Sequence, residues 1–175
     1  MWIFGYGSLI WRPDFEFDEA AVVALSGWRR SFSQGSPDHR GMPAAPGRVV
    51  TLRADPGGVC WGVAYRVPQA RSEATLQRLD EREQGGYDRV AITVSREPGD
   101  GSPWSAVTYV APVGNPHDLG PATLDAMVAQ MASACGPSGP NREYVLRLRE
   151  ALDERGISDP IVTEIAQALV ERVAP

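Results

Sequence analysis

The sequence predicts an α+β fold, in which a small mixed β-barrel or curved sheet is flanked by helices. Two observations indicate this class. Six or seven short strand-like segments, with one helix among them, occupy the first two thirds of the 175 residues, and the remainder has a helical pattern. No repeat, low-complexity run or linker interrupts the chain, so we expect a single domain over residues 1–175.

The strand-rich part begins with Trp2-Ile3-Phe4, because aromatic and β-branched residues favour strands. Residues 11–18 contain proline and indicate irregular structure. Two hairpins are then expected, one pairing residues 20–25 with 28–33 and the other pairing 48–53 with 59–67. Their turns are Ser26-Gly27 and Asp55-Pro56-Gly57-Gly58. Residues 34–47 between the hairpins predict a long loop, and long loops in compact domains are commonly functional.

The helical elements are predicted from their start and stop residues. Pro68 begins a helix over residues 69–83, which Gly85-Gly86 ends. Two strands follow at residues 87–95 and 104–111, around a turn at residues 98–101. Three further helices are expected at residues 121–135, 141–155 and 160–173.

The charge of the chain restricts its partners. Seventeen basic and 22 acidic residues give a net charge of −5, which argues against nucleic acid or an anionic membrane as the main partner. Every basic residue is arginine, which excludes a Schiff-base lysine and a P-loop lysine. No signal peptide or long apolar run is evident, so we expect a cytoplasmic protein, monomeric or weakly homo-oligomeric.

Cysteine and histidine are too sparse for a metal centre or a disulfide framework. Cys60 and Cys135 are the only cysteines, and each is expected to be a small buried hydrophobe. His39 and His117 lie 78 positions apart, and neither belongs to a histidine or cysteine pair with metal-ligand spacing. No G-x-S-x-G motif is present, so serine-hydrolase chemistry is disfavoured as well.

The first strand ends in Gly5-Tyr6-Gly7-Ser8, and two interpretations of this segment stay open. In one, consecutive backbone N–H groups point at a single ligand, while glycine removes the Cβ atoms that would hold an oxyanion or carboxylate away. In the other, the segment is a tight turn between two strands. A dinucleotide-binding loop is excluded, because the third glycine of that motif is absent.

Glu83 breaks a local rule, because it lies in the last turn of its predicted helix, where the helix dipole disfavours negative charge. Asp80 and Glu81 carry the same sign, and Arg78 and Arg82 relieve the repulsion only in part. Both effects raise the pKa of a carboxylate, which suits a group that accepts and returns a proton near neutral pH. A solvated acidic helix end is the alternative.

The loop of residues 34–47 carries further candidates. His39 is either a base oriented by Asp38 or a residue that structures a turn. Arg40 and Arg48 flank the same loop, where each either grips a carboxylate or is solvated at the surface. His117 is interpreted as part of a turn that leads to a helix cap.

Several short blocks of this chain, in register over nearly its whole length, resemble the ChaC-type γ-glutamylcyclotransferases that act on glutathione. They are Phe4-Gly5-Tyr6-Gly7-Ser8-Leu9-Ile10-Trp11, Gln34-Gly35-Ser36, Asp38-His39-Arg40-Gly41, Pro46-Gly47-Arg48-Val49-Val50-Thr51-Leu52, Trp61-Gly62-Val63-Ala64-Tyr65-Arg66, Arg82-Glu83-Gln84-Gly85-Gly86-Tyr87, Leu119-Gly120-Pro121-Ala122 and Gly136-Pro137-Ser138-Gly139. The departures are Gln84 where lysine is frequent, Met42 where smaller residues are usual, and arginine in place of every lysine.

The resemblance implies a small mixed β-barrel flanked by helices and a set of site residues. Glu83 is the implied proton acceptor, and Tyr6, Arg40 and Tyr109 are implied substrate contacts. A cradle for the γ-glutamyl group is implied at Ile3, Phe4, Gly5, Tyr6, Gly7, Ser8 and Leu9.

The reaction that the resemblance implies is a cyclisation of glutathione. The α-amine of the glutamyl group attacks its own γ-carbonyl, and the products are 5-oxoproline and Cys-Gly. No metal, cofactor or covalent enzyme intermediate is implied. Two alternatives stay open: a cyclotransferase for other γ-glutamyl amines or dipeptides, and a non-catalytic small-molecule binding module.

Overall fold

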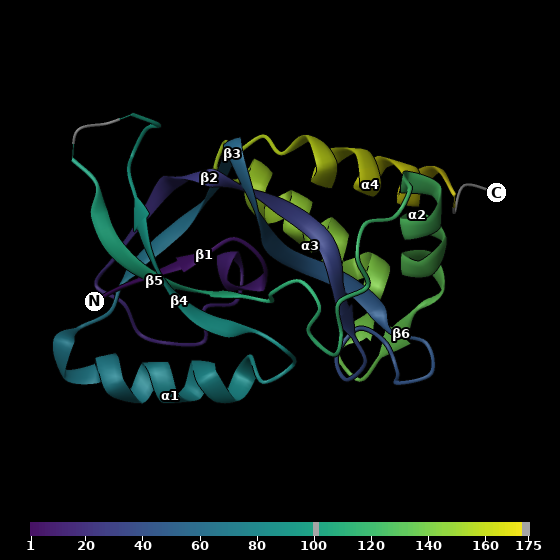
Figure 1. The fold of residues 1–175 in the computed structure, drawn as a ribbon, viewed down its shortest axis with the longest axis horizontal. Coiled ribbons are helices and arrows are strands. Elements are labelled where there is room, and N and C mark those ends of the chain that lie inside the picture. The colour runs from purple at the N-terminus through teal and green to yellow at the C-terminus, as the bar shows by residue number, and fades with distance from the viewer. Residues whose placement is uncertain (100–101, 173–175) are drawn as a thin grey trace. The chain divides into compact units, whose positions relative to one another are not determined.

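The computed structural model describes residues 1–99 and 102–172, and Figure 1 shows their strands and helices. The strands are β1 (Trp2–Gly5), β2 (Glu19–Ser36), β3 (Gly47–Arg66), β4 (Asp88–Val94), β5 (Trp104–Val110), β6 (Cys135–Gly136) and β7 (Gly139–Pro140). The helices are α1 (Ser72–Arg82), α2 (Leu124–Ser133), α3 (Asn141–Asp153) and α4 (Pro160–Glu171), with 3₁₀ turns η1 (Ser8–Ile10) and η2 (Gln69–Arg71). This mixture of strands and helices confirms the predicted α+β class.

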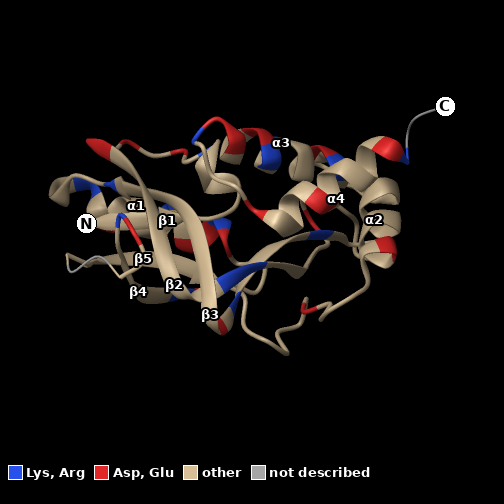
Figure 2. Ribbon diagram, turned by 90° about the horizontal axis from the view of Figure 1, so that it is seen from above, with Lys and Arg blue, Asp and Glu red and all other residues tan. Residues whose placement is uncertain are grey.

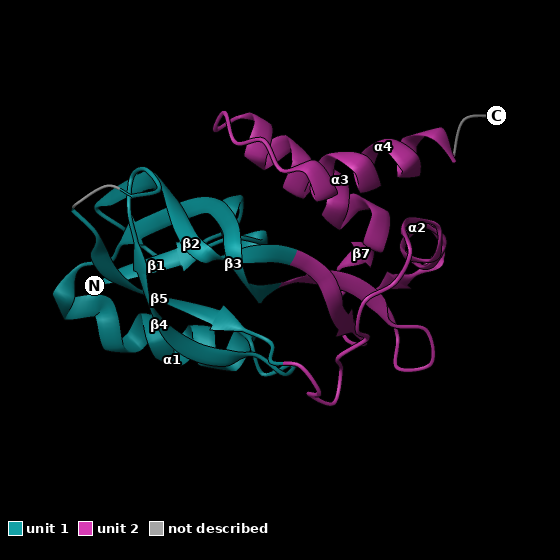
Figure 3. Ribbon diagram, turned by 45° about the horizontal axis from the view of Figure 1, so that its top comes forward, with its two compact units in different colours: residues 1–30, 52–112 teal, residues 31–51, 113–175 magenta. Residues whose placement is uncertain are grey.

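The chain forms two compact units, which Figure 3 shows in separate colours. Unit 1 consists of Met1–Arg30 and Leu52–Pro112, and unit 2 of Ser31–Thr51 and Val113–Pro175. The long strands β2 and β3 each contribute residues to both units. The single domain predicted from the sequence stays a prediction.

The main sheet has five strands in the order β2-β3-β1-β5-β4. In it β1 pairs antiparallel with β3 and parallel with β5, and β4 pairs antiparallel with β5. One isolated bridge connects its two edges, where Ala24 of β2 and Ser95, the residue after β4, exchange backbone hydrogen bonds of 2.8 and 3.1 Å. The predicted curved sheet is therefore confirmed (Figure 1). The alternative of a closed barrel is not formed by the described residues, because one bridge does not make a ladder between the edges.

Both predicted hairpins are wrong, because β2 and β3 run without interruption through the segments that were expected to turn. Gly27 has φ of +82°, so it changes the course of β2 without ending the strand. The Arg29 Nε of β2 lies 3.7 Å from the Asp55 carboxylate of the neighbouring strand β3. This ion pair lies beside both segments that were expected to turn. Pairing between long strands therefore overrides the local turn preference.

Most other elements occur where they were predicted, with shifted ends. Strands β4 and β5 confirm the pair at residues 87–95 and 104–111, while residues 100–101 of the turn between them lie outside the described residues. Helix α1 begins only at Ser72, because η2 precedes it. Helix α2 begins at Leu124 rather than residue 121, since the Thr123 hydroxyl accepts a hydrogen bond from the Ala126 N–H as an N-cap.

The last two helices begin at their predicted residues. Pro160 occupies the first turn of α4, and the Asp159 carboxylate before it accepts a hydrogen bond from the Val162 N–H. The predicted end of this helix, residue 173, lies outside the described part of the chain. Among the described residues, no helix combines the length and apolar character that a membrane crossing needs.

Unit 1 has a core between α1 and the sheet. Its buried members are Ile3, Leu9, Val67, Leu79 and Tyr109. These residues come from β1, η1, the position directly after β3, α1 and β5. The core therefore fixes α1, and with it the chain that follows Arg82, against the strand that carries the Gly-rich segment.

Unit 2 contains helices α2, α3 and α4, which pack on one another through buried apolar residues such as Met131, Leu148 and Ile165. Acidic and basic residues alternate along the outer face of α3 (Figure 2), where Arg147 lies 2.8 Å from Glu143. Both side chains are exposed, so this face is solvated, and an exposed ion pair of this kind stabilises a helix by only about 0.3–0.5 kcal/mol.

The two cysteines differ in environment. Cys60 is buried, as predicted, whereas Cys135 is exposed, and that part of the prediction is wrong. Cys135 belongs to the two-residue strand β6, and so short a strand offers no apolar layer that would cover its side chain.

Candidate active site

The Gly-rich segment is a tight turn that follows β1 directly. The Ile10 N–H donates to the Gly7 carbonyl at 3.0 Å, and the Trp11 N–H donates to the Ser8 carbonyl at 3.2 Å. Within the described residues, these bonds use the carbonyls of Gly7 and Ser8, and no bond donated by the N–H of either residue occurs. The predicted tight turn between two strands is not formed, because η1 follows the segment and β2 begins only at Glu19. The turn at Gly7 and Ser8 leaves two neighbouring donors for a ligand.

Gly5 is required where β1 enters this turn. A Cβ atom at Gly5 would lie 2.7 Å from the Leu9 Cβ, because the chain folds back on itself within four residues. The Tyr65 hydroxyl holds the far side of the turn by donating to the carbonyls of Leu9 at 2.9 Å and Ile10 at 3.1 Å. Two features therefore stabilise this backbone conformation: a glycine at position 5, and the hydrogen bonds from Tyr65 of β3.

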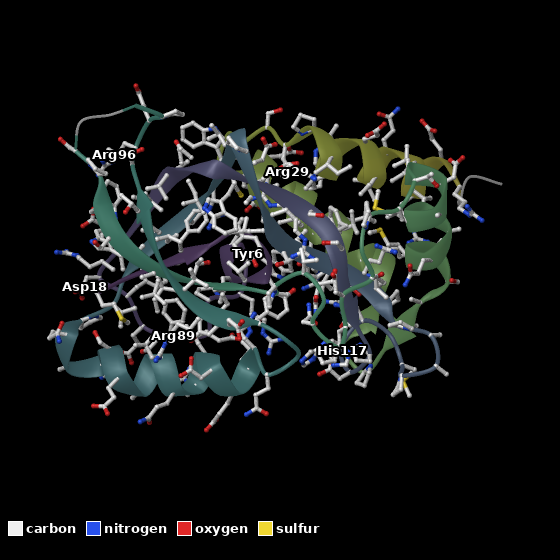
Figure 4. The ribbon with its side chains drawn as sticks, viewed as in Figure 1. Tyr6, Asp18, Arg29, Arg89, Arg96 and His117 are labelled. Atoms are coloured by element: carbon white, nitrogen blue, oxygen red, sulfur yellow. The ribbon has the colours of Figure 1, made fainter. Side chains whose placement is uncertain are left out.

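Tyr6 is buried, and its hydroxyl donates to the backbone carbonyl of Tyr109 at 2.6 Å. Figure 4 shows Tyr6 lying among the strands of unit 1. The phenol thus joins the Gly-rich turn to β5, and its contact with a substrate stays a prediction.

Tyr109 is buried in the core of unit 1, and its hydroxyl donates to the Asp80 carboxylate at 2.6 Å. Asp80 in turn lies 3.1 Å from Arg89, which Figure 4 shows beside α1. Burial is the largest cause that raises the pKa of the Tyr109 phenol above its ordinary range, and the hydrogen bond and charge of Asp80 add to it. The negative charge of Glu83 acts in the same direction, so Glu83 and Tyr109 lie within electrostatic range of each other.

Glu83 is the residue at which α1 ends. Its N–H donates to the Leu79 carbonyl at 2.9 Å, and its carbonyl accepts a hydrogen bond from the Tyr87 N–H at 3.3 Å. The backbone of Glu83 is therefore held on both sides, while its side chain keeps 18% of its surface exposed. Such a carboxylate is both positioned and reachable by a small molecule. The proton affinity predicted for it from the sequence stays a prediction.

Arg82 connects the Gly-rich turn with Glu83. Its Nη2 donates to the Ser8 Oγ at 2.8 Å, and its Nε lies 3.4 Å from the Glu83 carboxylate. A further bond from Nη1 to the Arg12 carbonyl, at 3.0 Å, holds the guanidinium in place. From the sequence, Arg82 was interpreted only as partial charge relief. The signal for its role was its position directly before Glu83, in the block that resembles the family.

Arg40 belongs to unit 2, and its partners are found there. Its Nη1 donates to the Pro140 carbonyl at 3.2 Å and lies 3.8 Å from the Glu143 carboxylate. The guanidinium also lies 6.0 Å from the centre of the Tyr144 ring, which is cation–π range. These contacts hold the Arg40 side chain in one position within unit 2. Its role as a substrate contact stays a prediction.

Arg48 has structural partners in unit 2 and is not solvated at the surface, so that interpretation from the sequence is wrong, while its grip on a ligand carboxylate stays a prediction. It is buried, and its Nη1 donates to the Phe32 carbonyl at 2.9 Å while its Nε donates to the Gln130 Oε1 at 2.6 Å. The Asn141 side chain pairs with the backbone of Arg48. Its Oδ1 accepts a hydrogen bond from the Arg48 N–H at 2.7 Å, and its Nδ2 donates to the Arg48 carbonyl at 2.8 Å. Burial lowers the pKa of the Arg48 guanidinium, and the charge of Asp118 opposes that shift.

The two histidines structure loops of unit 2. His39 is exposed, with its Nδ1 3.3 Å from the Ser138 Oγ and its Nε2 3.9 Å from the Asp38 carboxylate. The carbonyl of His117 accepts a hydrogen bond from the Gly35 N–H at 2.8 Å. These contacts favour the turn-structuring interpretation of His39 over that of an oriented base.

Comparison with known proteins gives a consistent set of relatives. The family described as ChaC-like protein matches residues 1–173. The Glutathione-specific gamma-glutamylcyclotransferase 1 of Homo sapiens is 45% identical over 152 residues, which cover 86% of this chain and 68% of the human protein. The Gamma-glutamylcyclotransferase 2-3 of Arabidopsis thaliana is 42% identical over 172 residues, which cover 95% of this chain and 86% of the plant protein.

A solved structure extends this similarity to the fold. A crystal structure of a γ-glutamyl cyclotransferase specific to glutathione, from yeast, superposes with a TM-score of 0.91 and 28% sequence identity. The match covers 98% of this chain and 96% of the yeast chain. The γ-glutamylcyclotransferase-like fold expected from the resemblance is thereby confirmed.

Proposed function

This chain belongs to the ChaC-like protein family, and from that premise we propose that it is an enzyme that converts reduced glutathione to 5-oxoproline and Cys-Gly. Relatives that are 45% and 30% identical to it, from Homo sapiens and Escherichia coli, are glutathione-specific γ-glutamylcyclotransferases by name. The observation that carries the proposal is the arrangement of Ser8, Arg82 and Glu83. In it one guanidinium holds both the Gly-rich turn and the acidic end of α1.

The first requirement of this reaction is removal of a proton from the substrate. The α-amine of a glutamyl group is protonated near neutral pH, and an ammonium group is not a nucleophile. Glu83 is the proposed base, because its carboxylate is partly exposed and its backbone is fixed at the end of α1. Positioned proton transfer of this kind contributes about 10²–10⁴-fold to a rate.

The second step closes the ring. The neutral α-amine attacks the γ-carbonyl carbon to form a five-membered lactam, and the amide bond to cysteine breaks. The attacking nitrogen loses its second proton as the ring closes, and Glu83 passes both protons in turn to the leaving nitrogen, which departs as the ammonium group of Cys-Gly, so no water is consumed. Because both reacting groups belong to one molecule, a cradle that folds the glutamyl chain supplies an entropic advantage.

Negative charge develops on the γ-carbonyl oxygen during ring closure. The N–H groups of Gly7 and Ser8 are the proposed donors to that oxygen, since neither donates elsewhere within the described residues. The Ser8 Oγ accepts a hydrogen bond from Arg82, which leaves its own O–H to donate to the substrate.

Two other functions make different predictions. A cyclotransferase for other γ-glutamyl amines or dipeptides would use the same cradle, because all these compounds share the glutamyl half. The names of the relatives favour glutathione over them. A non-catalytic binding module needs no base, and the positioned carboxylate of Glu83 argues against it.

Product analysis separates the three functions. The purified protein would be incubated without added metal with reduced glutathione, oxidised glutathione, γ-glutamylcysteine and γ-glutamylalanine, and 5-oxoproline would be measured. We expect release from reduced glutathione above all. Release of 5-oxoproline only from another compound would identify that compound, and not glutathione, as the substrate. Binding of any of these compounds without release of 5-oxoproline would support the non-catalytic binding module.

We further propose the domain organisation, oligomeric state and location of the enzyme. It acts as a single domain over residues 1–175, without metal or cofactor, as a monomer or weak homo-oligomer. A reducing cytoplasm, where the substrate is itself reduced, is its proposed location, and the free thiols of Cys60 and Cys135 are compatible with it.

A further inference from the structure

Arg30 is a buried cation that the proposed mechanism does not use. Only 3% of its surface is exposed, and it lies in none of the sequence blocks that resemble the family. Its Nε donates to the backbone carbonyl of Tyr6 at 2.7 Å, and its Nη2 donates to the carbonyl of Trp61 at 2.6 Å. One guanidinium thus clamps the Gly-rich turn to strand β3.

The bond to Tyr6 fixes the orientation of the next amide. In a trans peptide the C=O of one residue and the N–H of the following residue point in opposite directions, and no cis peptide bond occurs among the described residues. Because the Tyr6 carbonyl points at Arg30, the Gly7 N–H points away from it. Arg30 therefore determines the direction in which a proposed oxyanion donor is presented.

The same bond strengthens that donor. Hydrogen bonds from an ionised donor are shorter and stronger than neutral ones, and the low local dielectric of a buried site enhances the effect. A carbonyl polarised in this way withdraws electron density through its peptide group, which makes the N–H of Gly7 a better donor. The side chain of Tyr6 is held as well, by its bond to Tyr109, so the peptide has little freedom to rotate away.

We infer that Arg30 is a positioning residue, which orients and polarises the Tyr6–Gly7 peptide so that the Gly7 N–H stabilises negative charge on the substrate carbonyl. This inference rests on the proposed function. Arg30 touches no substrate in this account, and it acts through the backbone of the turn.

The test compares Arg30→Lys and Arg30→Gln with matched variants of the neighbouring residue. Arg29 is the control, because its side chain is 59% exposed and pairs with Asp55 at 3.7 Å. Loss of a whole oxyanion donor costs about 10²–10³-fold in kcat. Misorientation of one donor should cost less, so we expect Arg30→Gln to lower kcat on the order of 10- to 100-fold, with a smaller change in KM. Arg30→Lys should retain part of the rate, and Arg29→Gln should stay near the unaltered protein.

A second readout does not depend on turnover. The amide proton resonance of Gly7 should move upfield in Arg30→Lys and Arg30→Gln and stay in place in Arg29→Gln, since a weaker donor is less deshielded. If both Arg30 variants unfold, the unaltered protein still provides a measurement. There, the Arg30 Nε–H should exchange slowly with solvent, and its resonance should shift when 5-oxoproline binds.

The outcomes distinguish this inference from the proposed function. Folded Arg30 variants with unchanged kcat and an unchanged Gly7 resonance would overturn the role of Arg30, even in an active enzyme. So would a rapidly exchanging Arg30 Nε–H that 5-oxoproline does not affect, in the unaltered protein. An unaltered protein that releases no 5-oxoproline from glutathione would overturn the proposed function. The Gly7 resonance would still decide whether Arg30 orients and polarises the Tyr6–Gly7 peptide.

Discussion

Arg82 donates a hydrogen bond of 2.8 Å to the hydroxyl of Ser8, although 74 positions separate the two residues in the chain. The same guanidinium lies 3.4 Å from Glu83. A turn that presents backbone donors and a helix end that presents a carboxylate are therefore tied together by one side chain.

Replacement of the proposed base should greatly reduce turnover without unfolding the protein. Glu83→Gln keeps the size of the side chain, and the backbone bonds of Glu83 to Leu79 and Tyr87 do not involve the carboxylate. We expect kcat with glutathione to fall by about 10²–10⁴-fold, which is the usual contribution of a positioned acid–base group. Steady-state kinetics and a thermal melt of the variant provide the measurement.

Glu81→Gln is the matched control for that substitution. Glu81 belongs to the last turn of α1 and is exposed, so its variant changes the net charge equally. Similar losses in the two variants would mean that the charge at the helix end, rather than one base, supports the reaction.

The bond between Ser8 and Arg82 should appear as coupling between substitutions. Ser8→Ala and Arg82→Met each remove the same bond, so the double variant should lose less activity than the two single losses multiplied together. We expect a coupling of about 1–2 kcal/mol in kcat/KM, because a hydrogen bond from a charged donor is removed. Strictly additive effects would show that the two side chains act independently.

The backbone of the turn should not tolerate a side chain at Gly5. A Cβ atom there would lie 2.7 Å from the Leu9 Cβ, and overpacking of this kind costs about 1–3 kcal/mol. We expect Gly5→Ala to lower both the free energy of unfolding and kcat. Gly57→Ala is the control, since a Cβ at Gly57 meets no atom within 4 Å. Equal stability of the two variants in urea titrations would contradict the close approach in the turn.

Alkaline pH should destabilise the protein through Tyr109. Burial and Asp80 raise the pKa of its phenol, so the folded protein keeps a proton that the unfolded chain releases above about pH 10. That stabilisation is fully present below pH 10 and is lost as the pH rises toward the folded pKa. Asp80→Asn removes part of the cause, so Tyr109 should ionise at lower pH in that variant. Ultraviolet absorbance of tyrosinate, with Tyr109→Phe to identify the signal, would measure this. Identical titrations of Asp80→Asn and the unaltered protein would rule out the effect of Asp80.

The sequence predicts elements well where the signal is local. Pro160 after Asp159 marks the start of α4, because a cap and a first-turn proline act within one turn of helix. It fails in β2 and β3, where turn residues such as Gly27 are held in long strands by their neighbours in the sheet. Strand pairing is a long-range effect, and a local pattern does not contain it.

The same distinction holds for the candidate site. Glu83 is conspicuous in the sequence because a carboxylate opposes the helix dipole locally. The roles of Arg82 and Arg30 depend on partners 74 and 24 positions away, and no spacing rule joins them to the turn. Arg48 was expected either in solvent at the surface or on a carboxylate, and its burial among carbonyls of unit 2 excludes the solvated position.

Cyclisation of glutathione by Glu83 is tested by following 5-oxoproline and Cys-Gly together while the purified protein is incubated with reduced glutathione, beside Glu83→Gln under the same conditions. We expect the two products to appear in equal amounts, and the folded Glu83→Gln variant to release neither at a comparable rate. A folded, unaltered protein that releases no 5-oxoproline, or a Glu83→Gln variant that cyclises glutathione at a near-normal rate, would contradict this expectation.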